Sequence, residues 1–425
     1  MKKYILGLLC FLLVGCSSSD PKGSFSTTGR GTVKSFSDLP TLSCTDGSNM
    51  LIKSYKLIYE TVGIDGESKV QASAAVLVPA NILGGNGNAT TLLYLHGTIF
   101  KRSDAPSQFT TSNITPLELA PDSACNSLVT VVPDYLGLGE DTTQMHPHSH
   151  AKSLATASVD ALKAAQEFLK GELGITINKS NIIISGFSEG AYATMVTHRE
   201  IQENHASDFI VKASYPLAGA YDLSDTMYNA LFKSNTPYVD IMSNGQPLTG
   251  VSFVPYIILT YMRTNNITDS VSDIFISGLS DIETKYDMNT SMADITTYIN
   301  NALPSGKDNI LKEMINSDYN TAIDNDSNHP IRKALVENDA YKWKPETKML
   351  IIACDGDDIT PSTNATVAHN YMTNTLGSTV VSKQIVSADS HADCLMPGAQ
   401  AIMTDLTNLL SPSSPMKVYS TQIVK

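Results

Sequence analysis

Short strand-like runs that alternate with helix-forming stretches constrain the fold of this chain more than any other feature. Two of these runs, residues 91–95 and 128–132, are continuously apolar, as expected for strands buried on both faces of a sheet. Strands separated by helices predict a mainly parallel sheet in an α/β architecture. The other expected strands are residues 54–61, 70–78, 181–185, 213–221, 348–353 and 380–386, and the clearest expected helices are residues 154–169 and 397–410.

Two segments interrupt this alternation. Residues 16–50 are rich in Ser, Thr, Gly and Asp and are expected to form a flexible tether. Residues 222–345 carry apolar clusters between Asn-, Asp- and Ser-rich turns, which predicts a largely helical insertion. Residues 51–221 and 346–425 are then expected to form the α/β core.

The composition is that of an acidic globular protein. Hydrophobic residues make up 42% and charged residues 17%, which argues against extended disorder. The formal net charge is −13, whereas nonspecific nucleic-acid binding needs basic residues that displace counterions from phosphates. Nucleic acid is therefore not an expected partner.

The first residues have the pattern of a bacterial export signal. Two lysines precede an apolar run of eleven residues, which as a helix would span only about half of a bilayer core. Residues 13–16 read Leu-Val-Gly-Cys and resemble a lipobox, which implies removal of residues 1–15 and a lipid on Cys16. The resemblance implies an exported membrane lipoprotein. By analogy with that family, Ser17 rather than Asp after the cysteine favours the outer membrane if the cell has two. The alternative is an ordinary secretory leader with an incidental Cys16.

Four cysteines remain beyond this leader, namely Cys44, Cys125, Cys354 and Cys394. Four thiols in an exported protein suggest two disulfides, for which three connectivities exist. Because Cys354 and Cys394 flank the acid and base considered below, we favour the pairs Cys354–Cys394 and Cys44–Cys125. Four buried free thiols are the alternative. Metal ligation is not expected, since no Cys-x-x-Cys pair occurs.

A Gly-x-Ser-x-Gly string directly follows the expected strand at residues 181–185. The string is Gly-Phe-Ser-Glu-Gly at residues 186–190, and a helix is expected after it. A sharp strand-to-helix turn needs both glycines, because a Cβ at either position would collide with neighbouring backbone. The turn raises the serine hydroxyl above the sheet and points the helix N-terminus at developing negative charge. Ser188 is therefore the expected nucleophile, and a structural serine in a tight turn is the alternative.

Residues 93–98, Leu-Tyr-Leu-His-Gly-Thr, end a buried strand upstream of this string. Here the sequence resembles the α/β-hydrolase superfamily, in which a His-Gly segment at this place supplies one oxyanion donor. The resemblance implies that the backbone N–H groups of Thr98 and Glu189 stabilise an oxyanion. It also implies that His96 is structural and is not the catalytic base.

The same resemblance locates the acid and the base. Residues 355–361, Asp-Gly-Asp-Asp-Ile-Thr-Pro, look like the acid turn of the superfamily, and alignment on the final proline selects Asp357. Asp358 and Asp355 remain as alternatives. His391 comes after the last strand, and the chain order Ser, Asp, His is the order of this superfamily.

Three histidines at positions 146, 148 and 150 could share one side of an extended segment and bind a metal. No carboxylate stands at ligand spacing near them, so an ordinary loop is the preferred interpretation and no metal is expected.

Three further segments resemble the secretory lipase branch of the superfamily, namely residues 55–79, residues 132–139 and the His-Pro at 146–147. Members hydrolyse carboxylic esters, often acylglycerols, without cofactors, and carry a helical cap between nucleophile and acid. The resemblance implies an esterase or lipase that acts on an ester or lipid substrate through an acyl-enzyme. Glu189 departs from the Gly or Gln more usual after the nucleophile, which leaves the substrate preference open. A serine peptidase on the same fold and a non-catalytic surface binding protein are the alternatives.

Overall fold

The computed structural model describes residues 29–45, 49–84, 88–233, 249–303, 310–410, 415–419 and 421–424. The predicted signal peptide at residues 1–15 and the predicted anchor at Cys16 lie outside these ranges. Within the described ranges, no helix combines the length and the apolar character needed to cross a bilayer.

One sheet organises the core. Its strands are β1 (Val33–Cys44), β2 (Leu51–Val62), β3 (Lys69–Pro79), β4 (Asn88–Leu95), β5 (Val129–Pro133), β6 (Thr176–Phe187), β7 (Val211–Leu217), β8 (Lys348–Cys354), β9 (Val381–Val386) and β10 (Thr421–Ile423). Their order in the described sheet is β10-β1-β2-β3-β5-β4-β6-β7-β8-β9. The strands from β5 to β9 in this order pair in parallel, and antiparallel pairing joins the rest. The predicted α/β architecture with a mainly parallel sheet is confirmed.

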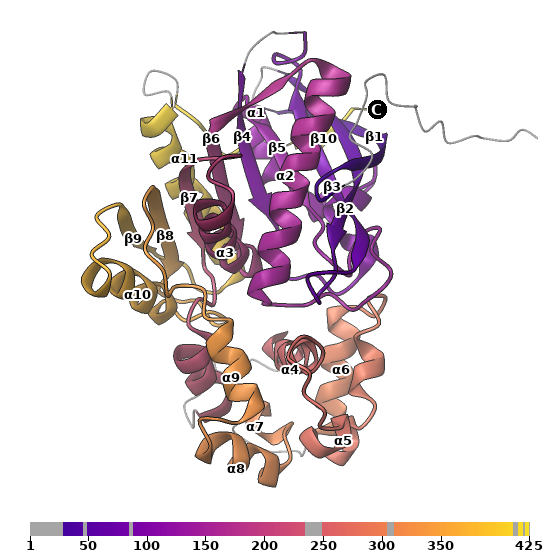
Figure 1. The fold of residues 1–425 in the computed structure, drawn as a ribbon, viewed down its shortest axis with the longest axis vertical. Coiled ribbons are helices and arrows are strands. Elements are labelled where there is room, and N and C mark those ends of the chain that lie inside the picture. Colours follow the sequence, from indigo (N-terminus) through magenta and orange to yellow (C-terminus); the bar gives the residue numbers. More distant parts are fainter. Residues whose placement is uncertain are drawn as a thin grey trace, which may run out of the picture.

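Helices cover both faces of this sheet (Figure 1). They are α1 (Ala120–Cys125), α2 (Ala151–Leu173), α3 (Glu189–Asn204), α10 (Thr363–Asn370) and α11 (Leu395–Leu410). Side chains alternate between the two faces along a strand. In β6, Ile182 and Ile184 pack in one apolar cluster with α2, α3 and α10, whereas Ile183 packs in a second cluster with α1 and α11. Because the central strands are buried on both faces, they appear in the sequence as continuous apolar runs.

The tether predicted for residues 16–50 is wrong over residues 33–44. This segment forms β1, which pairs with β2 on one side and with β10 on the other. Its apolar residues Val33, Leu42 and Cys44 are buried, whereas several of its Ser, Asp and Thr side chains remain partly exposed. A half-solvated strand near a sheet edge therefore has the composition of a linker, although it pairs with β2 over most of its length and with β10 over residues 42–44.

A helical insertion separates β7 from β8, and its helices gather at one end of the sheet, at the bottom of Figure 1. They are α4 (Phe253–Thr264), α5 (Val271–Ile274), α6 (Met292–Ala302), α7 (Ile310–Glu313), α8 (Ser317–Asn325) and α9 (Pro330–Glu337). In its described residues the only β pairing is the isolated bridge between Phe275 and Ile315. The predicted, largely helical insertion is confirmed, and we call it the cap.

The two segments that connect the core to the cap are hydrogen-bonded to each other. The N–H and O–H groups of Ser224 both donate to the buried carboxylate of Asp339, at 3.0 and 2.6 Å. The N–H of Ala340 donates to the carbonyl oxygen of Tyr221 at 2.9 Å. These bonds hold the segment that enters the cap against the segment that leaves it.

Both favoured disulfides are present. Cys44–Cys125 joins the end of β1 to α1, and Cys354–Cys394 joins the end of β8 to the segment before α11. The Cα atoms of each pair are 5.8 Å apart, within the usual range for a disulfide.

Candidate active site

Ser188 occupies a sharp turn between β6 and α3. Its φ and ψ angles are 60° and −120°, a backbone conformation that residues other than glycine rarely adopt. A Cβ atom at Gly186 or at Gly190 would collide with the carbonyl oxygen of Leu95, at the end of β4. The two glycines therefore let the turn press against the neighbouring strand, as predicted from the Gly-x-Ser-x-Gly string.

His391 and Asp357 form a buried pair at the same end of the sheet. Nδ1 of His391 lies 2.8 Å from Oδ2 and 3.0 Å from Oδ1 of Asp357. The carboxylate also accepts the backbone N–H groups of Ile359 and Thr360 and the hydroxyl of Thr360. A carboxylate on Nδ1 favours the tautomer with its proton there, which leaves Nε2 free to accept a proton.

The other two aspartates of this turn contact backbone and not the imidazole. Oδ1 of Asp358 accepts the backbone N–H of His391 at 2.8 Å, and Oδ1 of Asp355 accepts that of Ala388 at 3.1 Å. Both therefore hold the histidine loop in place. Of the three candidates, the structure brings only Asp357 to the imidazole ring.

Nε2 of His391 is buried and has no hydrogen-bond partner among the described residues. The imidazole stacks on the ring of Phe187, the residue before Ser188, with the ring centroids 4.7 Å apart. A buried, unpaired polar atom costs free energy, so its retention beside the serine turn points to a functional role. The absence of a partner on Nε2 is compatible with such a role, because catalytic hydrogen bonds are often long before substrate binds and shorten in the complex.

The His96-Gly97-Thr98 segment passes directly beside the serine turn. A Cβ at Gly97 would lie 3.7 Å from the Cβ of Ser188. His96 is fully buried, and its ring nitrogens contact the carbonyl oxygens of Gly97 and Asp134. Burial lowers the pKa of His96 to about 4, so this imidazole is neutral at pH 7. These contacts support the structural role expected for it.

Sequence reasoning missed Glu118, which braces this segment. Its carboxylate accepts the N–H of Gly97 at 2.9 Å and the hydroxyl of Tyr94 at 2.8 Å. Burial raises the pKa of this carboxyl group to about 7. Glu118 adopts a φ of 47° in an irregular segment, and no sequence motif marks such a position.

The side chain of Glu189 is buried beneath the loop that precedes α2. Its Oε1 lies 3.0 Å from Nε2 of His146 and accepts the N–H of Ser149 at 3.0 Å, and its Oε2 lies 3.8 Å from Nε2 of His148. Burial opposes ionisation of Glu189, but the two imidazoles and these hydrogen bonds lower its pKa below the usual range. Glu189, the residue after Ser188, is thus an anchor for this loop.

The three histidines considered as metal ligands do not share one site. Nδ1 of His150 contacts the hydroxyl of Ser153, apart from the other two imidazoles. Across the described ranges, no group of three or more His, Cys, Asp or Glu side chains is placed to hold a metal ion.

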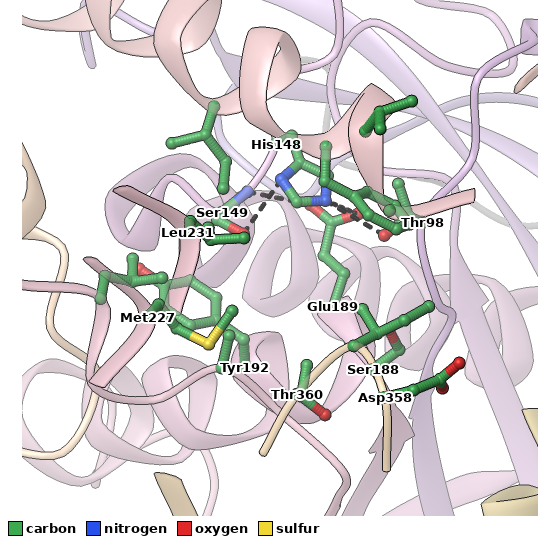
Figure 2. A pocket seen from close by; sticks show the side chains of 17 residues that line it. Thr98, His148, Ser149, Ser188, Glu189, Tyr192, Met227, Leu231, Asp358 and Thr360 are labelled. Carbon is green, nitrogen blue, oxygen red and sulfur yellow. Dashed lines mark hydrogen bonds and ion pairs between the residues drawn. The ribbon is translucent and has the colours of Figure 1, made fainter. Parts of the chain in front are cut away.

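A mostly apolar pocket adjoins Ser188 (Figure 2). Its empty volume is about 760 Å³, including its open mouth. The core supplies polar groups such as Thr98, Ser188 and Thr360. Figure 2 shows Met227 and Leu231 across the pocket from Thr98 and Ser188. The apolar lining comes from the cap and the segment that leads into it, through Leu223, Met227, Leu231, Val251, Phe253 and Ile257.

No family model and no curated protein matches the sequence. Solved structures do match. The rice cell wall degrading esterase LipA from Xanthomonas oryzae is 24% identical, with a TM-score of 0.75 over 90% of this chain and 99% of that one. A putative hydrolase from Legionella pneumophila is 21% identical, with a TM-score of 0.72 over 90% and 99% of the two chains. Candida antarctica lipase A is 14% identical, with a TM-score of 0.63 over 94% and 87%.

At these identities the similarity defines the fold and not the activity. It extends over nine tenths of this chain and over 99% of the esterase and of the Legionella hydrolase. Together with the strand order and the strand-turn-helix geometry, it confirms the fold that the sequence predicted: the chain has the α/β-hydrolase fold.

Proposed function

We propose that the protein is a serine hydrolase that cleaves carboxylic esters through an acyl-enzyme. The observation that carries this proposal is the buried His391–Asp357 pair, whose unpaired Nε2 lies beside the turn of Ser188. His391 takes the proton of Ser188 as the hydroxyl attacks the ester carbonyl, and Asp357 stabilises the imidazolium that forms. His391 then returns the proton to the leaving alcohol, and water releases the acid by the reverse sequence.

Two backbone N–H groups are proposed to stabilise the oxyanion. One belongs to Thr98, which follows β4 and lines the pocket with Ser188. The other belongs to Glu189, the first residue of α3, where helical N–H groups lack intrahelical partners and the helix dipole favours negative charge. Each donor is expected to contribute about 3 kcal/mol of transition-state stabilisation.

The pocket suits an ester with an apolar acyl group. Its cap side presents aliphatic and thioether side chains, so burial of a hydrocarbon there removes apolar surface from water on both partners. Two of the structurally similar proteins are named as an esterase and a lipase, which agrees with this substrate class.

Labelling with a fluorophosphonate tests the proposal. The wild-type protein should be labelled at Ser188, which peptide mass mapping would show, and should hydrolyse p-nitrophenyl esters in preference to peptide amides. Ser188→Ala should be neither labelled nor active. A wild-type protein that resists labelling and leaves esters intact would contradict the proposal, and preferential cleavage of amides would identify a peptidase.

We also propose that Cys16 carries a lipid anchor after export, in the outer membrane if the cell has two. The support is the tetrad at residues 13–16 and the short apolar run before it. The full-length protein should fractionate with membranes, whereas Cys16→Ser should be released and lack the acyl mass. An unmodified N-terminal peptide from the membrane fraction would exclude this anchor.

A further inference from the structure

Thr98, which lines the pocket with Ser188, carries a hydroxyl group as well as a backbone N–H. Its Oγ1 lies 3.1 Å from Nε2 of His148, its hydrogen-bond partner in the described part of the chain. Figure 2 shows Thr98, His148, Ser149 and Glu189 as neighbours on one side of the pocket. The role open to the hydroxyl depends on which atom donates in this bond.

The imidazole of His148 carries a single proton, because burial lowers its pKa to about 4. If Nε2 accepts, the hydrogen of the Thr98 hydroxyl is used in this bond. If Nε2 carries the proton, Thr98 Oγ1 accepts and its own hydrogen is free to donate elsewhere. The tautomer of His148 therefore decides whether Thr98 can act on a substrate.

Two neighbours favour the tautomer with the proton on Nε2. Oε2 of Glu189 lies 3.8 Å from Nε2, beyond hydrogen-bond distance, and has no hydrogen-bond partner among the described residues. Its negative charge therefore favours a proton on Nε2, while the hydrogen bond of that N–H goes to Thr98 Oγ1 at 3.1 Å. The hydroxyl of Ser149 lies 3.0 Å from Nδ1 and can donate to it. The other oxygen of Glu189 is already occupied by His146 and the N–H of Ser149, which leaves Oε2 facing His148.

We propose that the Thr98 hydroxyl is a third donor to the oxyanion and that His148 is the positioning residue that keeps its hydrogen available. In this arrangement Glu189 and Ser149 fix the tautomer of His148, His148 donates to Thr98 Oγ1, and the Thr98 hydroxyl donates to the carbonyl oxygen as it gains negative charge. The inference rests on the proposed serine-hydrolase function and extends it to a side chain. It also gives a reason for a carboxylate at position 189.

Thr98→Val tests the hydroxyl, because valine has nearly the same shape and keeps the backbone N–H. Loss of an oxyanion donor typically costs about 10²–10³ in kcat, and for a third donor we expect a loss of about 10- to 100-fold. The KM for p-nitrophenyl butyrate should change little, since the bond forms in the transition state. Thr98→Ser is the matched control, which keeps the hydroxyl and should stay within about threefold of wild type. Melting temperatures verify folding of each variant.

His148→Leu tests the positioning role. It should lower kcat to a similar extent, and the double variant Thr98→Val/His148→Leu should be no slower than either single variant, because both remove the same interaction. Losses that multiply would show that His148 does not act through Thr98.

Unchanged kcat in Thr98→Val would overturn the third donor, as would a rise in KM alone. Labelling of Ser188 and ester turnover in the wild-type protein would then still support the proposed function. If the wild-type protein is neither labelled nor active, the proposed function fails, and the role of Thr98 fails with it.

Discussion

Ser188→Ala and His391→Ala are expected to lower kcat on a short-chain ester by about 10⁴-fold or more, with little change in melting temperature. Ser188 is a poor nucleophile until a neutral imidazole accepts its proton. His391 pairs with Asp357 through Nδ1, stacks on Phe187 beside the serine turn, and keeps a buried Nε2 that has no hydrogen-bond partner among the described residues. If Ser188→Ala kept wild-type turnover, the serine-hydrolase proposal would be wrong.

The aspartates provide an internal control for this prediction. Asp357→Asn should also be severe, because an amide nitrogen next to Nδ1 disfavours the productive tautomer. Asp358→Asn and Asp355→Asn should retain most activity, since the remaining amide oxygen can still accept the backbone N–H that each carboxylate binds. The measurement compares kcat of the five purified variants at one pH, with melting temperatures as folding controls. An inactive Asp358→Asn beside an active Asp357→Asn would place the acid one residue later.

The architecture could be predicted because its signals are local. Strands buried on both faces have continuous apolar runs, and the turn at Ser188 needs glycine at fixed offsets. β1 could not be predicted in this way. Its place in the sheet depends on pairing with β2 and with β10, which lies at the far end of the chain. Its partly exposed polar side chains conceal the alternation that would mark a strand.

The residues of the candidate site also fall into two groups, those that local sequence signals predict and those that they do not. Ser188, Asp357 and His391 each follow a strand, so chain order and local motifs identify them. Glu118 and His148 follow no such rule. Glu118 reaches Gly97 from an irregular segment, and His148 reaches Thr98 across a loop that Glu189 anchors. These contacts join segments that are distant in the chain. Glutamate and histidine are also common on solvated surfaces, so the residue type alone does not mark either position.

Removal of the Cys354–Cys394 disulfide is expected to lower both stability and activity. Cys354 stands three residues before Asp357, and Cys394 three residues after His391, so the bridge joins the loops that carry the proposed acid and base. Cys354→Ala/Cys394→Ala should cost about 2–4 kcal/mol of unfolding free energy. Under native conditions it should also reduce kcat, because the distance between carboxylate and imidazole is less restrained.

The second disulfide provides the matched control for this prediction. Cys44–Cys125 closes a longer loop, with a sequence separation of 81 against 40, so its loss should destabilise the fold by at least as much. It joins β1 to α1, away from His391 and Asp357 in the strand order, so Cys44→Ala/Cys125→Ala should keep near-wild-type kcat well below its melting temperature. Urea unfolding and kcat at 25 °C, measured for both double variants, separate the two effects. Equal losses of activity in the two variants would mean that the Cys354–Cys394 bridge only stabilises the fold. A selective loss in the first would show that it also sets the geometry of the proposed acid and base.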